Sequence, residues 1–273
     1  MTETFDIAIV GAGITGCAIA RQLARYDLSI CVVEAANDIA LGASKANGGL
    51  VHAGYDPAPG TVKAQVNARG CELYGTWAQE LGFLFRRTGS MVLGFNDEDR
   101  AHLEKLRQNG LANGVPELSI IGPERIHELE PRASADAACA LWCPSTGFVD
   151  PFEVAIAALE NAVANGVTFM RSAPVEAIEV AGGEATDGAV RFTLATPTGD
   201  VHCRYLINAA GNGARVSVIA FKRSDRRLTD THALGDSLLA ELMLLAEPYQ
   251  TLEKTIPRID QQICAALKAL ITH

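Results

Sequence analysis

Short apolar runs and amphipathic segments alternate at the amino-terminal end of the chain. Apolar residues fill positions 7–10 and all but the first position of 29–33, as in strands that are buried on both faces of a sheet. Between these runs, the segment 14–24 carries Ile19 and Leu23 at the four-residue spacing of one helix face. The pattern predicts a strand, a helix and a second strand, in that order.

The middle of the chain predicts further helices with strands between them. A helix is expected over 61–81, and another after Asn96 or Asp97, each of which has the side chain of an N-cap. One or two strands are expected within 83–95, and a short strand and a short helix within 119–131.

The following segments predict one more helix and then four strands. Asp150, Pro151 and Glu153 form a typical helix start, and the helix is expected to end near Gly166. Glycine-containing turns then separate four predicted strands, 167–171, 175–180, 190–195 and 201–208. This alternation implies a parallel sheet with an inserted α+β region between about 77 and 147.

Three glycines follow the first predicted strand. Gly11 would permit a tight turn, Gly13 would let the backbone approach a pyrophosphate, and Gly16 would let the helix pack close to the strand. The free N–H groups and the positive dipole end of the helix would then face the phosphates. Glu34 follows at close to the spacing of about 20 residues expected for a carboxylate that accepts a hydrogen bond from a ribose hydroxyl. Since a carboxylate there disfavours a 2′-phosphate, the pattern predicts an NAD-like or FAD-like nucleotide.

A second segment, 40–54, is rich in small residues that no packing requirement explains well. Small side chains let a chain run against a flat ligand, which is needed when a reactive ring such as a flavin is buried at the sheet edge. A plain NAD-linked dehydrogenase would leave this segment unexplained.

Composition and charge exclude several classes of function. With 273 residues, of which 48% are hydrophobic, the chain can bury the core of one or two domains. Its formal charge of −9 argues against a nucleic-acid partner. The seven cysteines contain no C-x-x-C pair, so neither a disulfide framework nor a metal site is predicted. Cys139 and Cys143, the closest pair, are expected to be small apolar residues in a reduced cytosol.

The expected location is cytoplasmic. The first apolar run has the length of a signal-peptide core, but the acidic residues Glu3 and Asp6 precede it and no small-residue cleavage pattern follows. No stretch approaches the roughly 18 to 20 apolar residues of a membrane span, so any membrane contact would be peripheral.

Five segments in this order resemble the FAD-dependent oxidoreductases of the D-amino-acid oxidase superfamily, most closely the branch of glycerol-3-phosphate dehydrogenase and L-2-hydroxyglutarate oxidase. The segments are 11–16 with Glu34, 42–54, 59–64, 147–151 and 208–211, and the resemblance covers about 4–220. It implies an α/β fold: an FAD-binding, Rossmann-like sheet of the glutathione-reductase type, an inserted α+β substrate region and a helical C-terminal tail. The expected parts are the first FAD-binding part (1–76), the inserted region (77–147), the second FAD-binding part (148–220) and the divergent tail (221–273).

By this resemblance the cofactor is FAD. The residues expected to contact it are Gly11, Ala12, Gly13, Ile14, Thr15, Gly16, Glu34, Ala35, Ser44, Asn47, Gly48, Gly49, Val175, Ala209, Ala210 and Gly211. The resemblance implies that Ser44, Asn47, Gly48 and Gly49 line the pyrophosphate and the isoalloxazine. It also implies that the backbone of Val175 contacts the adenine end.

His52 lies where the family brings a polar side chain to the substrate side of the flavin. We hypothesise that His52 accepts the proton of the substrate hydroxyl, or orients that hydroxyl, while a hydride passes to flavin N5. The alternative is a histidine that hydrogen-bonds its own loop.

Tyr55, Lys63 and Arg86 are candidate contacts for an anionic substrate, although residues of these types are more often solvated. Of the neighbours Arg86 and Arg87, at most one faces inward on a strand. The glycerol-phosphate enzymes of the better-known branch carry an arginine shortly after the His-x-Gly segment. Tyr55 follows that segment here, which argues against phosphate specificity.

Past Ala220 the resemblance stops, where family members continue with the rest of the substrate domain. The tail predicts two helices that are either a packed pair, an interaction surface for another chain, or a foreign or frame-shifted end. The leading prediction is oxidation of a small hydroxy compound, as by glycerol-3-phosphate dehydrogenase. The alternatives are oxidation of L-2-hydroxyglutarate or an amino acid, and a non-catalytic FAD-binding fragment that a partner subunit completes. The sequence does not predict the electron acceptor.

Overall fold

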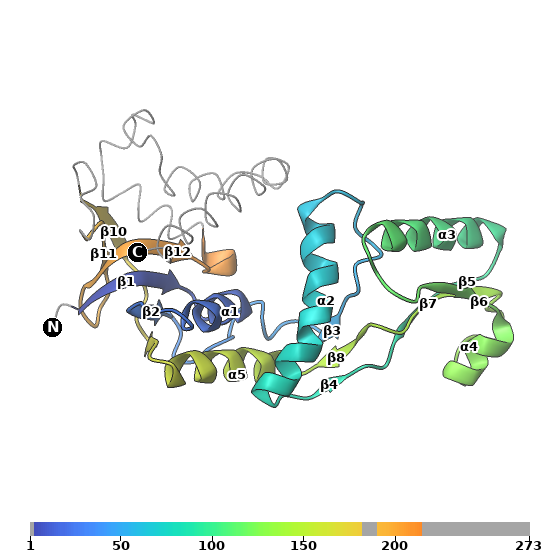
Figure 1. Ribbon diagram of the computed structural model, residues 1–273, viewed down its shortest axis with the longest axis horizontal. Coiled ribbons are helices and arrows are strands. Elements are labelled where there is room, and N and C mark those ends of the chain that lie inside the picture. Colours follow the sequence, from blue (N-terminus) through green and yellow to red (C-terminus); the bar gives the residue numbers. More distant parts are fainter. Residues whose placement is uncertain (1–2, 182–189, 215–273) are drawn as a thin grey trace. The chain divides into compact units, whose positions relative to one another are not determined.

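A computed structural model describes residues 3–181 and 190–214 (Figure 1). The two predicted tail helices lie outside the described residues. The described chain forms two compact units, one of the residues up to Asn47 and from Pro151 onward, the other of Gly48–Asp150. The second unit thus begins earlier than residue 77, where the sequence placed the start of the inserted region.

A six-stranded sheet with the order β10-β11-β12-β1-β2-β9 forms the centre of the first unit. Its strands are β1 (Glu3–Val10), β2 (Ile30–Val33), β9 (Thr168–Met170), β10 (Ala177–Val180), β11 (Phe192–Ala195) and β12 (Val201–Asn208). The strands β12, β1, β2 and β9 are parallel neighbours, which confirms the expected parallel sheet for this part.

The strands β10 and β11 are not part of the parallel arrangement, because β11 pairs antiparallel with both β10 and β12. Residues 196–200, which join β11 to β12, are too few for the crossover of a dozen or more residues that parallel strands need. The sheet is therefore mixed, with its parallel part at β12-β1-β2-β9.

Two helices of the first unit, α1 (Ile14–Leu23) and α5 (Pro151–Ala164), pack against each other (Figure 1). Leu23 of the predicted helix face is buried and Ile19 is half-buried. Helix α5 buries mostly alanine, so the two helix backbones can approach closely.

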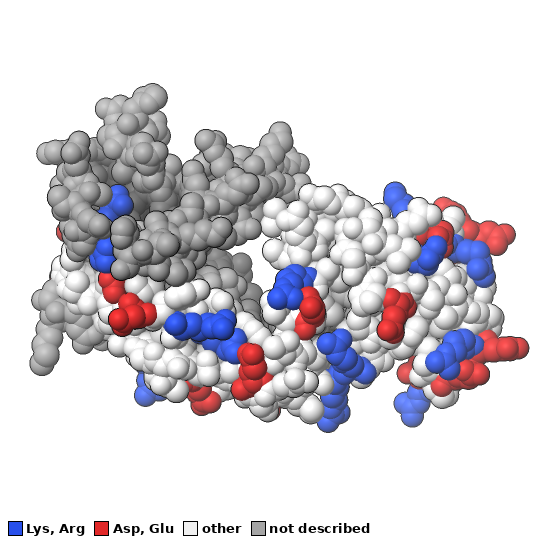
Figure 2. Space-filling model, in the orientation of Figure 1, with Lys and Arg blue, Asp and Glu red and all other residues white. Residues whose placement is uncertain are grey.

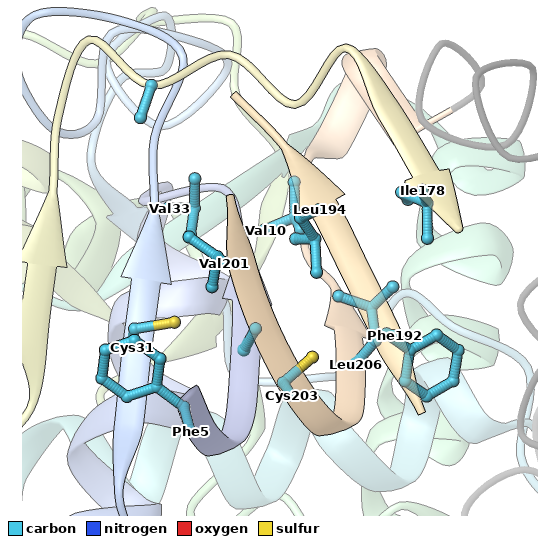
Figure 3. Close-up of a cluster of buried hydrophobic side chains, with 12 residues drawn as sticks. Phe5, Val10, Cys31, Val33, Ile178, Phe192, Leu194, Val201, Cys203 and Leu206 are labelled. Carbon is cyan, nitrogen blue, oxygen red and sulfur yellow. The ribbon is translucent and has the colours of Figure 1, made fainter. Parts of the chain in front are cut away.

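A buried cluster of the first unit joins five strands of the sheet (Figure 3). Phe5 and Val10 of β1 lie in it with Cys203 of β12 and with Phe192 and Leu194 of β11. The opposite sides of β1 and β2 are buried too, since Ile7, Ile9 and Val32 are at most 1% exposed. Burial on both faces explains why these two strands are apolar throughout.

Asp6 of β1 is hydrogen-bonded to Ser29, the residue before β2, and to Arg204 of β12. Its carboxylate accepts hydrogen bonds from the N–H and the hydroxyl of Ser29, at 2.9 and 2.8 Å, and from Arg204 at 3.0 Å. Burial alone would raise the pKa of Asp6, but the hydrogen bonds from Ser29 and the charge of Arg204 outweigh it and hold the pKa below its ordinary value.

We expect Asp6→Asn to lower the free energy of unfolding by about 1.5–3 kcal/mol, the range of hydrogen bonds to a charged group. Because the folded pKa lies below the unfolded one, this contribution is present above about pH 4 and is lost as the pH falls through the folded pKa. Urea unfolding at pH 7 and pH 3 measures both effects. Asp27→Asn is the control, because Asp27 is exposed in the turn before β2. This role of Asp6 would be contradicted if Asp6→Asn and Asp27→Asn lost the same stability, or if Asp6→Asn lost as much stability at pH 3 as at pH 7.

Two three-stranded sheets and three helices make up the second unit. The sheets have the orders β3-β8-β4 and β5-β7-β6. The strands are β3 (Leu50–Val51), β4 (Phe85–Arg86), β5 (Ser90–Gly94), β6 (Ser119–Ile121), β7 (Cys139–Cys143) and β8 (Gly147–Val149), and the helices are α2 (Val62–Leu81), α3 (Asp97–Ala112) and α4 (Pro123–Leu129).

Two helices of the second unit, α2 and α3, have side-chain N-caps. The hydroxyl of Thr61 accepts from the N–H of Ala64 at the start of α2. Of the two candidate caps of α3, Asn96 is the cap, because its side-chain oxygen accepts from the N–H of Asp99 at 2.9 Å. Cys139 and Cys143 are buried free thiols of β7.

One face of the described residues is mixed in charge. On the face shown in Figure 2, basic and acidic side chains of the described residues are interspersed. None of the helices in residues 3–181 and 190–214 combines the length and the hydropathy that a transmembrane span requires.

Candidate functional site

The first unit contains a cavity of about 620 Å³ at the carboxyl ends of its parallel strands. Loops that follow β1, β2 and β12 contribute to its wall, together with residues 41–44 and 173–175. Ligands of open α/β sheets bind in this position, and the volume lies within the range of about 300–1,000 Å³ for ligand sites. The cavity is therefore the candidate ligand site of this unit.

Close backbone contacts explain the three glycines of the turn after β1. Gly11 has a φ of +104°, and a Cβ there would lie 2.6 Å from the carbonyl oxygen of Ala209. A Cβ on Gly16 would lie 1.9 Å from the carbonyl oxygen of Gly11, so α1 starts directly against the turn. Gly13 lines the cavity, and a Cβ there would lie 3.1 Å from the Ser44 hydroxyl. Any side chain at Gly11 or Gly16 would displace the turn.

The amino-terminal end of α1 offers positive charge to the cavity. Its N-cap is Gly13, which has no side chain to satisfy the first N–H groups, and its first turn holds no acidic residue. The N–H of Ile14 donates to the hydroxyl of Ser44 at 2.9 Å. Helix α3 differs, because three acidic residues stand in its first turn. The dipole end of α1 is thus left for an anion of a ligand.

Glu34 supplies the negative end of the same cavity. One of its carboxylate oxygens accepts from the N–H of Ala12 at 2.7 Å, and the other from the N–H of Ala36 at 2.8 Å. Each carboxylate oxygen has a second lone pair, so Glu34 can still accept from a ligand hydroxyl. An N–H-lined end for phosphate and a carboxylate for hydroxyl groups fit a nucleotide that carries a diphosphate and a ribose.

A buried thiol lies under the turn. Cys17 contacts the carbonyl oxygen of Ala12 at 3.4 Å, and burial, together with the charge of Glu34, raises the pKa of its thiol to about 12. The thiol stays protonated at neutral pH, so the cavity holds a binding site and no thiolate nucleophile from Cys17.

The structure brings most of the predicted FAD contacts together around the cavity. Those that line it are Gly11, Gly13, Ile14, Thr15, Glu34, Ala35, Ser44, Asn47, Val175, Ala209, Ala210 and Gly211. Ala12 and Gly16 lie behind this lining, in the contacts just described. Gly48 and Gly49 belong to the second unit.

Several lining residues were not predicted. They are Val10, Val33, Leu41, Gly42, Ala43, Ala173, Pro174, Asn212 and Gly213. Asn212 and Gly213 continue the small-residue segment after β12, and Gly42 and Ala43 lie in the segment 40–54. Both pairs could therefore have been predicted from the sequence. Pro174 carried no signal of its own.

The four residues proposed for catalysis and substrate binding all lie in the second unit. His52 is exposed directly after β3. Tyr55 is half-buried and packs against the buried cluster of this unit. Lys63 pairs with Asp56 at 3.5 Å, both side chains being mostly exposed. Arg86 is exposed on β4, opposite Phe148 of β8.

Comparison with known proteins identifies relatives of the chain. The family described as "DAO: FAD dependent oxidoreductase" matches residues 6–234. A glycerol 3-phosphate dehydrogenase of Caloramator mitchellensis is 41% identical over 207 residues, which are 76% of this chain and 42% of that protein. The mitochondrial L-2-hydroxyglutarate dehydrogenase of Homo sapiens is 31% identical over 247 residues, 87% of this chain and 52% of that protein.

Among solved structures, a reduced L-alpha-glycerophosphate oxidase of Mycoplasma pneumoniae with FAD bound superposes with a TM-score of 0.74. It is 29% identical, and the match covers 81% of this chain and 57% of that one. The chain thus spans about half the length of the relatives it matches.

Proposed function

Since the chain belongs to the DAO family of FAD-dependent oxidoreductases, we propose that its first unit holds FAD in the cavity at the carboxyl ends of β1, β2 and β12. The start of α1 and the Ser44 hydroxyl would bind the diphosphate, and Glu34 would bind the ribose. The observation that carries this proposal is the cavity itself, whose wall contains a helix start with glycine as its N-cap, the carboxylate of Glu34 and a turn that only glycine permits.

We further propose that the whole protein oxidises a small hydroxy compound, with glycerol 3-phosphate as the first candidate. Relatives named as glycerol 3-phosphate dehydrogenase and oxidase support this choice. When bound, FAD supplies the acceptor for a hydride at flavin N5. The chain's own contribution would be His52, which accepts or orients the substrate hydroxyl proton.

L-2-hydroxyglutarate is the second candidate substrate. Relatives named as L-2-hydroxyglutarate dehydrogenase match the chain at 31% identity. The resemblance also favours it: by that resemblance the glycerol-phosphate branch carries an arginine shortly after the His-x-Gly segment, and Tyr55 follows that segment here. A carboxylate substrate does not require that arginine.

The test is an anaerobic titration of the purified protein. We expect a yellow preparation with one FAD per chain, whose flavin absorbance bleaches with glycerol 3-phosphate faster than with L-2-hydroxyglutarate or an amino acid. The reverse order would assign the second candidate. FAD retained without bleaching by any of them would support a binding fragment that a partner subunit completes. A colourless protein that ignores added FAD in calorimetry would overturn the whole proposal.

A further inference from the structure

A second cavity, of about 590 Å³, lies within the second unit. Ala53, the residue after His52, is part of its wall. Asn113, also in the wall, donates through its side-chain amide to the carbonyl oxygens of Gly54 and Pro57, both at 2.9 Å. The cavity is thus built on the segment that follows His52, and its wall holds that segment in place.

Arg87 lies in the wall of this cavity and is exposed to solvent. Its Nη1 donates to the carbonyl oxygen of Ser145 at 2.9 Å, and its guanidinium lies 4.8 Å from the ring centre of Phe85. Helix α2 leaves room for it at Gly75, where a Cβ would lie 2.7 Å from Nη2. Three contacts fix the group without neutralising it, because no carboxylate pairs with Arg87 among the described residues.

The other groups of the wall leave the cavity positive. Arg69 pairs with Glu72, so these two charges cancel. Burial raises the pKa of the Cys71 thiol, although the charge of Arg87 acts in the opposite direction, and Cys71 is neutral at neutral pH. The remaining charge is that of Arg87, whose planar N–H groups match the oxygens of a carboxylate or a phosphate.

We propose that this cavity is a binding site for a small carboxylate or phosphate anion, with the Arg87 guanidinium as its main partner. The site is separate from the FAD cavity, since every residue of its wall belongs to the second unit. A bound anion would touch the wall that holds residues 53–57, the segment directly after His52. The proposal does not depend on FAD binding.

Calorimetric titration with inorganic phosphate and with malonate tests the site. The titrations are carried out with saturating FAD, because free phosphate could otherwise bind at the start of α1. We expect saturable binding of at least one anion, weakened about tenfold or more by Arg87→Gln, which removes a charge-assisted contact. Arg100→Gln is the control, because Arg100 is exposed on α3 and outside the cavity, and it should bind as the unchanged protein does.

Two further measurements keep the outcome decisive. Arg87→Lys retains the charge but not the planar fork, so its affinity for the anion should lie between those of the unchanged protein and Arg87→Gln. This variant replaces Arg87→Gln in the comparison if Arg87→Gln loses folding stability. In the unchanged protein, the amide NMR signals of Gly114 and Val115, both in the wall, should shift on titration. Absence of saturable binding of either anion, unshifted Gly114 and Val115, or equal binding by Arg87→Gln would overturn the proposal.

Discussion

Gly16→Ala is expected to lower the free energy of unfolding by about 3 kcal/mol and to weaken FAD binding by about 10- to 100-fold. The added methyl carbon would lie 1.9 Å from the carbonyl oxygen of Gly11, so helix α1 and the turn must separate. Overpacking of this kind costs about 1–3 kcal/mol, and this contact is at the severe end. The displaced turn would lose at least one hydrogen bond to the diphosphate, which is worth about 1.5–3 kcal/mol. Urea unfolding and titration of the apoprotein with FAD measure the two effects.

Gly70→Ala is the matched control for this prediction. Gly70 also lies inside a helix, α2, but no atom stands within 4 Å of a Cβ placed there. Alanine should therefore stabilise this helix by about 0.5–1 kcal/mol and leave FAD affinity unchanged. If both alanine variants raised stability, the packing of α1 against Gly11 would not be the reason for glycine at position 16.

His52→Ala is expected to slow anaerobic reduction of the flavin by substrate about 100- to 10,000-fold, the usual contribution of a general base. His52 is exposed at the end of β3, so its removal leaves no hole in the core and FAD affinity should be unchanged. Stopped-flow absorbance at saturating substrate measures the rate. The same experiment on His102→Ala, an exposed histidine of α3, should give the unchanged rate.

The result would also separate the two interpretations of His52. A histidine that only hydrogen-bonds its own loop would affect stability and not the rate of reduction. A normal rate in His52→Ala would therefore end the catalytic hypothesis and leave the base to be sought elsewhere in the protein.

Sequence was most informative where backbone conformation leaves little choice. A turn with a φ of +104° and a helix within van der Waals contact of it admits only glycine, so Gly11 and Gly16 could be interpreted without the structure. The cap of α3 was recognisable for a similar local reason, because Asn96 acts on an N–H three residues away.

The features that the sequence did not predict depend on contacts between residues that are distant along the chain. Strand β7 has no alternation of apolar and polar residues that would predict it, and it is stabilised by its pairing with β5 and β6. The contacts that fix Arg87 come from Phe85, Gly75 and Ser145, which lie on three separate segments. No pattern of neighbouring residues in the sequence predicts that these three segments meet at Arg87. From the sequence, Arg87 could therefore be considered only as the neighbour of Arg86.

The neighbouring position of β1 and β12 has a consequence for how the protein is made. Val10 pairs with Asn208, and the wall that begins at Val10 is completed by residues up to Gly213. At about 5–20 residues per second, a ribosome needs roughly 10–40 s to add the intervening chain. During that time the hydrophobic first strand has no partner on one side. The wall of the cavity is therefore complete only when nearly the whole described chain has emerged.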